Sequence, residues 1–258
     1  MQTTKSQDGT TIAYELTGSG PLLVLVHGAG SSHARWTSVL PALAAEFTVC
    51  AVDRRGRGAS GDAACWAIER EFEDVAAVVD AVGEPVNLLG HSFGGICALE
   101  ALLRTDNVEK LILCEPPVAF PPISDEIVAR LQSSLEAGDR EDVLTTFLSE
   151  VAEIPESDIA KMRQSSLWPE RLAAAHTLLR EGLAVGAYRL DARRFAEKAT
   201  PTLLMLGGDS PAYYRQSIAS LEAALPHSRV TVLPGQQHVP MDTAPDLFVR
   251  EVLGFLRG

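Results

Sequence analysis

Short apolar runs alternate with longer segments of helical spacing along the first 115 residues. In the longer segments apolar residues recur every three or four positions, which predicts helices over Trp36–Ala45, Glu69–Val82 and Phe93–Arg104. Most of the apolar runs are bounded by Gly, Asp or Pro, which is typical of buried parallel strands. The predicted strands are Thr11–Leu16, which alternates like an exposed strand, then Leu22–Val26, Thr48–Val52, Val86–Leu89 and Leu111–Cys114. Strands that alternate with helices predict an α/β fold with a parallel sheet and crossover helices.

The alternation stops between Ile123 and about Lys198, where the spacing predicts only helices. These are expected at Ile123–Ala137, Glu141–Val151, Ser157–Ser165, Arg171–Leu183 and Asp191–Lys198. The alternation then resumes with the strands Pro201–Leu206 and Arg229–Leu233 and the helices Tyr213–Leu225 and Pro245–Leu256. Such an insert of about 75 residues, placed after a strand, is expected to cover the ligand crevice as a lid. A second helical layer that only stabilises the domain is the alternative.

The clearest chemical signal is Gly90-His91-Ser92-Phe93-Gly94-Gly95, which follows a predicted strand and begins a predicted helix. A GxSxG motif in this context forms a sharp turn that holds the serine in a strained conformation. Glycines two positions before and after the serine let neighbouring backbone come close without a Cβ clash. The hydroxyl then lies at a helix N-terminus, where the dipole favours negative charge. Ser92 is therefore the predicted nucleophile.

A glycine-rich turn, His27-Gly28-Ala29-Gly30-Ser31, follows the predicted strand Leu22–Val26. Such a turn can direct a backbone N–H to the same point as the amide of Phe93. Two converging amides form an oxyanion hole, in which each donor contributes about 2.7–4 kcal/mol of transition-state stabilisation. We therefore expect the N–H groups of Ala29 and Phe93 to bind the oxyanion. A turn that satisfies only its own carbonyls is the alternative.

The general base is expected to be a histidine late in the chain, because this arrangement runs serine, acid, histidine. His238 lies in a loop between the last predicted strand and the final helix, where an imidazole can reach the serine hydroxyl. The other five histidines are placed less well for this role. His27 lies in the glycine-rich turn and His33 just after it, and His91 lies beside the nucleophile. His176 lies in a predicted helix, and His227 in a loop after Pro226. His238 is therefore the predicted base, since imidazole is suited to both proton transfers at neutral pH.

Four motifs together resemble the α/β-hydrolase superfamily: His27–Gly30, Asp53–Gly58, Gly90–Gly95 and Gly235–His238. The resemblance covers core segments from residue 11 to 257. It implies the α/β-hydrolase fold, a mostly parallel eight-stranded sheet with helices on both faces, and an all-helical lid between the sixth and seventh strands. It also implies a Ser–His–acid triad and no cofactor. The implied division is a core of residues 1–119 and 199–258 and a lid of residues 120–198.

Two residues compete for the acid of the triad. Members of the superfamily commonly place it three residues after a glycine that ends the seventh strand. Here that position is Ser210, and Asp209 lies one residue early. Some branches, including certain lactone hydrolases, take the acid from the sixth strand instead, and here Leu111–Cys114 leads into Glu115. Two prolines after Glu115 fix the following backbone, so Glu115 is the preferred acid and Asp209 the alternative.

Composition restricts the partners and the compartment. Against 34 acidic residues there are 22 basic ones, which gives a net charge of −12 and an isoelectric point near 4.9. Nucleic acid or an anionic membrane surface would repel such a chain. The longest apolar run, Leu22–Val26, is far shorter than the ~20 residues of a membrane span, and no signal peptide is recognised. Cysteines without CxxC spacing are typical of buried thiols in a reducing cytoplasm, where we expect a monomer or homodimer.

Some residues invite a binding role. The segment Asp53–Gly58 lacks the lysine and spacing of a phosphate loop, so we expect a structural turn with Asp53 paired to a nearby arginine. No motif predicts a catalytic metal. Side chains of the insert and its margins could line an acyl or ring pocket, with ordinary packing as the alternative for each. Substrate binding is assigned to Trp36, Phe120 and Trp168, and the further candidates are Phe147, Met162, Tyr188 and Tyr213.

The sequence thus predicts a serine hydrolase that cleaves a carboxylic ester or lactone through an acyl-Ser92 intermediate. Its substrate is expected to be a small molecule with an apolar acyl or ring part. The same triad serves carbon–carbon bond hydrolases, thioesterases, amidases and perhydrolases, which stay as alternatives. Hydrolases of dienone acids need donors for a substrate carboxylate, and the elbow offers no arginine before Arg104, which disfavours that branch. A non-catalytic binder of a small ligand is the hypothesis from a different class.

Overall fold

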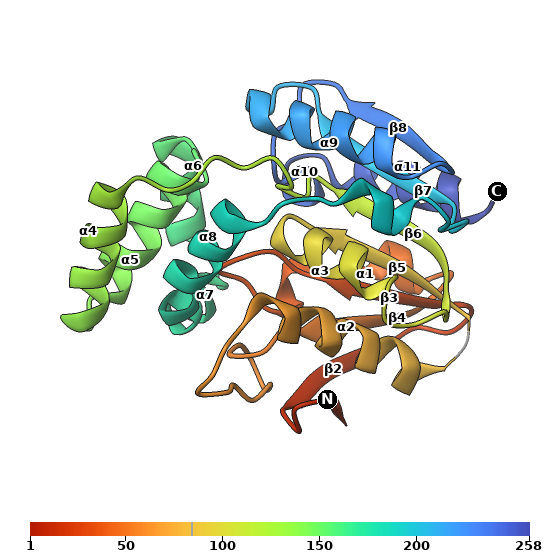
Figure 1. Ribbon diagram of the computed structural model, residues 1–258, viewed down its shortest axis with the longest axis horizontal. Helices are drawn as coiled ribbons and strands as arrows, with labels where there is room; N and C mark the ends of the chain where they lie inside the picture. Colours follow the sequence, from red (N-terminus) through yellow and green to blue (C-terminus); the bar gives the residue numbers. More distant parts are fainter. Residues whose placement is uncertain (84) are drawn as a thin grey trace.

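Strands from both ends of the chain form one eight-stranded sheet in the computed structural model, which describes residues 1–83 and 85–258 (Figure 1). The strand order is β1-β2-β4-β3-β5-β6-β7-β8. The first two strands pair antiparallel, whereas β3 to β8 run parallel. The strands are β1 (Gln2–Lys5), β2 (Thr11–Thr17), β3 (Leu22–Val26), β4 (Thr48–Asp53), β5 (Val86–His91), β6 (Val108–Cys114), β7 (Thr202–Gly207) and β8 (Ser228–Leu233). This is the predicted mostly parallel sheet of an α/β-hydrolase fold.

Helices cover both faces of the sheet, because alternate residues of a buried strand point to opposite sides. In β5, Leu88 packs on the side of α2 (Ile68–Val82), α3 (Phe93–Ala101) and α9 (Ala212–Ala224). The next residue, Leu89, packs on the side of α1 (Leu40–Ala44), α10 (Pro240–Thr243) and α11 (Pro245–Leu256). The two apolar cores hold the parallel strands rigid, so that residues at the strand ends have fixed positions.

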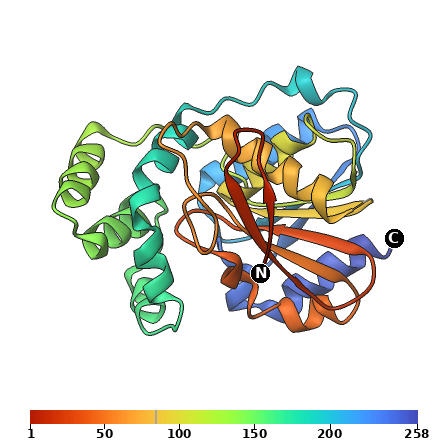
Figure 2. The same ribbon diagram turned by 90° about the horizontal axis from the view of Figure 1, so that it is seen from below.

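The chain between β6 and β7 is helical and forms a lobe beside the sheet in both views (Figures 1 and 2). Its helices are α4 (Asp125–Glu136), α5 (Arg140–Thr146), α6 (Glu156–Arg163), α7 (Trp168–Ala174) and α8 (Leu178–Ala187), with one π turn at Phe147–Val151. Leu131, Leu144 and Ile159 are fully buried in a separate apolar core of the lobe, against which Ala29 packs. Since Ala29 follows β3, the lobe meets the sheet at the carboxyl ends of its strands.

Several sequence predictions differ from the observed elements, among them the predicted helix Asp191–Lys198, where only a 3₁₀ turn at Ala192–Phe195 forms. Strand β1 was missed, because four residues at the sheet edge, none of them buried, give no apolar run. The predicted helix Trp36–Ala45 is a 3₁₀ turn at His33–Trp36 followed by α1, where Pro41 starts a new helix. The predicted helix Arg171–Leu183 is divided between α7 and α8 by a 3₁₀ turn at Ala175–Thr177. None of the helices within the described residues is both long and apolar enough to cross a membrane.

Asp53 is paired with a histidine, so the predicted arginine partner was wrong. Its Oδ1 accepts hydrogen bonds from the backbone N and from Nδ1 of His33, each at 2.8 Å. Its Oδ2 accepts one from Ala59 N at 3.0 Å. A Cβ at Gly58, where φ is +53°, would overlap the Asp53 carboxylate. The segment is therefore a structural turn, as expected, with its arginines directed elsewhere.

Buried ion pairs of that turn connect the sheet to the lobe. Arg54 donates to Glu71 of α2 at 3.0 Å and also to Glu181 of α8. Arg57 pairs with the same two carboxylates and donates to Thr177 at 2.8 Å. Each of these charged side chains is at most 1% exposed, so each charge depends on its partners rather than on water. Removing one of them would leave an uncompensated charge between the lobe and the sheet.

Candidate active site

Ser92 lies at the turn from β5 into α3, with φ 55° and ψ −128°. A positive φ in a non-glycine residue costs on the order of 1–3 kcal/mol and persists only where the surroundings impose it. One such restraint is the bond that Ser92 N donates to Cys114 O at 2.9 Å. Another is the close approach of β3, since a Cβ at Gly94 would overlap the carbonyl oxygens of Val26 and His27. The strained elbow therefore presents the serine at the N-terminus of α3.

His238 is hydrogen-bonded to a fully buried carboxylate. Its Nδ1 lies 2.8 Å from Oε2 of Glu115, which follows β6 directly. The second oxygen of Glu115 accepts the backbone N–H of Gly207 at 2.7 Å. Glu115 also has a positive φ of 47°, which turns its backbone sharply at the strand end. Because an ionised carboxylate only accepts, the shared proton sits on Nδ1 and leaves the lone pair of Nε2 directed away from Glu115.

Asp209, the alternative acid, lies apart from the imidazole. It is exposed, and its backbone N donates to Gln236 O at 2.9 Å. Ser210, which occupies the position common for the acid, is buried. Of the two candidates from the sequence, the structure thus brings only Glu115 to His238.

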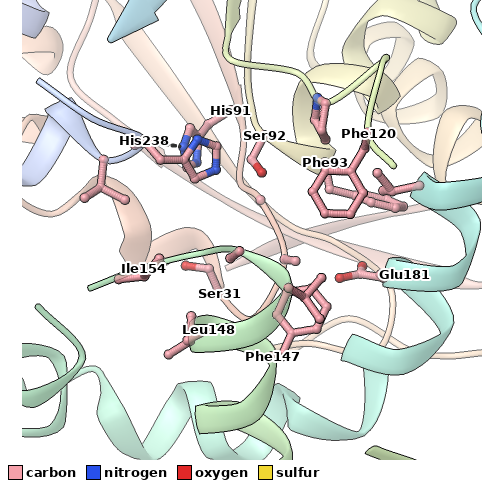
Figure 3. Close-up of a pocket in the computed structure, with 18 of the residues that line it drawn as sticks. Ser31, His91, Ser92, Phe93, Phe120, Phe147, Leu148, Ile154, Glu181 and His238 are labelled. Atoms are coloured by element: carbon pink, nitrogen blue, oxygen red, sulfur yellow. Dashed lines mark hydrogen bonds between the residues drawn. The ribbon is translucent and has the colours of Figure 1, made fainter. Parts of the chain in front are cut away.

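Nε2 of His238 is hydrogen-bonded to a tyrosine hydroxyl. The hydroxyl of Tyr214, a buried residue of α9, lies 3.0 Å from Nε2 and donates to it, while the two rings stack at a centroid distance of 4.4 Å. Among the described residues, Ser92 makes no side-chain hydrogen bond to His238 in this structure. Both residues nevertheless line the same pocket (Figure 3). Bonds of this kind are often long in unliganded enzymes and tighten only with substrate.

The predicted oxyanion donors both line the pocket that contains the serine. Phe93 is the first residue of α3, so its N–H has no partner inside the helix. Ala29 stands in the turn after β3 and lines the same pocket as Ser92 and Phe93. A Cβ at Gly28 would lie 2.9 Å from Ser92 Cβ, so a glycine is what allows the turn to come this close.

The pocket in front of Ser92 has about 770 Å³ of empty space, part of which is open to solvent. Apolar side chains of the lobe face the serine across it, among them Phe147, Leu148 and Ile154 (Figure 3). Phe120 and Met162 line it as well. The lobe thus supplies much of the apolar wall together with Arg171 and Glu181, while Ser92 and His238 come from the core.

Several residues predicted for the pocket lie elsewhere. Trp36 is fully buried in the core with α1 and α11, and its ring packs edge-on against His91 with centroids 6.5 Å apart. Trp168 packs in the core of the lobe and donates to Glu141 at 3.1 Å. Neither lines the pocket, so both assignments were wrong: each indole has a complete packing partner within its own core. Tyr188 and Tyr213 are likewise not part of the wall.

Two other histidines near the serine are structural. His27 is fully buried; its Nε2 accepts from Arg54 N at 3.2 Å and its Nδ1 donates to Gly28 O at 2.8 Å. His91 donates from Nε2 to the backbone carbonyl of His238 at 2.8 Å and so holds the loop that carries His238. Burial, aided by nearby positive charge, keeps the pKa of both His27 and His91 well below the ordinary value. Both are therefore neutral at physiological pH.

Comparison with known proteins gives the family. A model of the alpha/beta hydrolase family matches residues 23–251, which is most of the chain. The chain belongs to the α/β hydrolase family. This hydrolase is 31% identical to a pimeloyl-[acyl-carrier protein] methyl ester esterase of Aeromonas hydrophila, over 95% of this chain and 99% of that protein.

Solved structures agree with this assignment. An α/β hydrolase from Sphaerobacter thermophilus is 39% identical to this chain, with a TM-score of 0.87. The match covers 99% of this chain and 100% of that one. An esterase from Rhodococcus is 26% identical, with a TM-score of 0.78 over 100% of this chain and 98% of that one. The eight-stranded sheet and the family are therefore established.

Four polar residues of this α/β hydrolase's pocket were not found from the sequence: Arg35, Arg171, Glu181 and Tyr214. Tyr214 and Arg171 lie in predicted helices with no motif around them, so nothing in the sequence indicated that they reach the pocket. Arg35 also lines it, and its place just after the glycine-rich turn was the available signal. No arginine lies between the elbow and Arg104 in the sequence, but the fold brings Arg35 and Arg171 to the pocket from other segments.

Proposed function

We propose that this α/β hydrolase cleaves a carboxylic ester or lactone through an acyl-Ser92 intermediate. The observation that carries the proposal is the pairing of His238 with the buried Glu115 in the same pocket as the strained Ser92. The names of the relatives, a methyl ester esterase and an esterase, favour an ester bond over thioester, amide or carbon–carbon substrates. Carboxylesterase or lactonase activity is the specific form of the proposal.

In the acylation step, Ser92 Oγ attacks the carbonyl carbon while its proton passes to Nε2 of His238. The lone pair of Nε2 is available once the Tyr214 hydroxyl is displaced, since Glu115 holds the proton on Nδ1. The oxyanion accepts the N–H groups of Ala29 and Phe93. The tetrahedral intermediate collapses, and the alcohol leaves with the proton from Nε2. A water molecule, deprotonated by His238, then attacks the acyl-serine. The second tetrahedral intermediate collapses, the proton on Nε2 returns to Ser92 Oγ, and the acid is released.

The lobe, residues 120–198 in this proposal, acts as a lid on the core formed by residues 1–119 and 199–258. Phe120, Phe147 and Leu148 line the pocket with apolar surface, which suits an apolar acyl or ring part of a small substrate. Closing such a pocket excludes water while the ester is attacked.

A fluorophosphonate probe with intact-mass detection tests the proposal. Wild-type protein should gain one adduct and hydrolyse p-nitrophenyl acetate, and Ser92→Ala should do neither. Ester turnover by Ser92→Ala at a rate comparable to wild type would contradict the acyl-serine mechanism. A folded wild-type protein that forms no adduct and hydrolyses no ester would instead support the non-catalytic binder.

A further inference from the structure

Two buried arginines from distant parts of the chain line the pocket that contains Ser92. Arg35 lies in the 3₁₀ turn after the glycine-rich turn, and Arg171 lies in α7 of the lobe. They are 4% and 7% exposed, and the Nε of each has no hydrogen-bond partner within residues 1–83 and 85–258. Buried N–H donors without acceptors cost free energy. These donors therefore point to an acceptor that is not part of this chain.

The charges around the two arginines do not balance. Arg35 pairs with Asp242, whose side chain is 39% exposed. Arg171 donates from Nη1 to Gly30 O at 3.2 Å, but no carboxylate of the described part of the chain lies within 4.0 Å of it. Glu170, its neighbour, accepts instead from Ser32 Oγ at 2.5 Å. Among the described residues, the two guanidinium groups thus have one carboxylate within ion-pair distance, that of Asp242.

Arg171 stays charged despite its burial. Burial lowers the pKa of Arg171 to about 10, and repulsion from Arg35 acts in the same direction, while Asp242 and Glu170 oppose both. The group is therefore ionised at neutral pH and carries a positive charge with little compensation from the protein. An anion bound beside it would supply the missing charge and accept the free donors.

We propose that Arg171, with Arg35 nearby, forms a subsite for a carboxylate of the substrate. A guanidinium offers two parallel N–H donors that match the two oxygens of a carboxylate. The bond from Arg171 to Gly30 O fixes this subsite beside the turn that carries Ala29. The substrate class that fits is an ester or lactone whose acyl part bears a second, free carboxylate. This inference rests on the proposed hydrolysis at Ser92 and adds the chemistry that selects the substrate.

Binding of glutarate tests the subsite without any turnover. Glutaramide is the matched ligand, since it has the same chain length and no charge. Calorimetry or a thermal shift should give wild-type protein a Kd for glutarate at least about tenfold lower than for glutaramide. Arg171→Gln should remove this difference, and the exposed Arg193→Gln, the matched control, should keep it. Arg171→Lys, which keeps the charge without the fork, should give an intermediate value.

Turnover supplies the second test, through the ratio of kcat/KM for monomethyl glutarate to that for dimethyl glutarate. This ratio should fall about tenfold or more in Arg171→Gln and stay constant in Arg193→Gln. Equal binding of glutarate and glutaramide to wild-type protein would overturn the subsite even if Arg171→Gln does not fold. A difference that persists in folded Arg171→Gln would overturn it too. Glutarate binding without ester hydrolysis or probe labelling would support the subsite and contradict the proposed function, and hydrolysis without the preference would do the reverse.

Discussion

The hydroxyl of Tyr214 lies 3.0 Å from Nε2 of His238, on the nitrogen that the proposed mechanism needs as its base. The other nitrogen, Nδ1, is bonded to Glu115 at 2.8 Å. Both nitrogens of the imidazole therefore have partners before a substrate arrives. The serine proton can reach Nε2 only after the tyrosine hydroxyl has moved away.

Replacing Tyr214 by Phe should accelerate the reaction of Ser92 with a fluorophosphonate. The substitution keeps the ring stacked on His238 but removes the hydrogen bond that competes with Ser92 for Nε2. Breaking one neutral hydrogen bond costs about 0.5–1.5 kcal/mol, so the labelling rate should rise about two- to tenfold. Tyr213→Phe is the matched control, because that neighbour makes no hydrogen bond to His238 among the described residues. A slower Tyr214→Phe would show that the hydroxyl assists the base.

Glu115→Gln should lower ester turnover by about 10⁴-fold, as expected when an amide replaces the acid that orients a catalytic histidine. Glu115 accepts an N–H on each oxygen, from His238 and from Gly207, so an amide would oppose one donor with another. The measurement is kcat for p-nitrophenyl acetate, with circular dichroism to check folding. Asp209→Asn is the matched control, and a comparable loss in that variant would move the acid to Asp209.

Glu181→Gln should destabilise the protein. Glu181 is fully buried and pairs with both Arg54 and Arg57, so its loss leaves positive charge without compensation between the lobe and the sheet. Breaking a buried pair in this way costs about 3–5 kcal/mol of unfolding free energy. Urea denaturation measures the change, with the exposed Glu222→Gln in α9 as the control. Equal stability of the two variants would mean that the network does not hold the lobe.

The pair of His33 and Asp53 predicts a dependence of stability on pH. The hydrogen bond to Asp53 raises the pKa of His33 above its ordinary value of 6.5, although burial opposes this. The folded state therefore holds the proton more tightly than the unfolded state. The resulting stability is complete below pH 6.5 and is lost as the pH rises through the raised pKa.

Urea denaturation at several pH values checks this prediction. The difference in unfolding free energy between wild-type protein and His33→Gln should be largest in acid and shrink as the pH rises. His227→Gln, at an exposed position, should show no such trend. A difference for His33→Gln that is independent of pH would contradict the assignment.

The sequence by itself determined the elements that carry a periodic or local signal. The apolar runs predicted the parallel strands, with Leu22–Val26 found at its predicted bounds. The elbow at Ser92 and the loop at His238 could be located because glycine spacing and strand ends are local features. The lobe was visible as a stretch without strands, since its helices bury their apolar faces against one another.

Only the tertiary structure decided which side chains meet. Glu115 and Asp209 both follow strands, so the sequence could not choose between them. The way in which the ends of β6 and β7 meet the loop after β8 places Glu115 2.8 Å from His238. Arg171 and Tyr214 reach the pocket from segments that lie more than 70 residues after Ser92 in the sequence. Arg171 belongs to the lobe, and Tyr214 follows the lobe in the chain. Trp36 and Trp168 are large aromatic residues of the kind that often lines a pocket, but each packs within an apolar core instead. Contacts between distant segments depend on how the layers pack, and a single sequence carries no periodic signal for that.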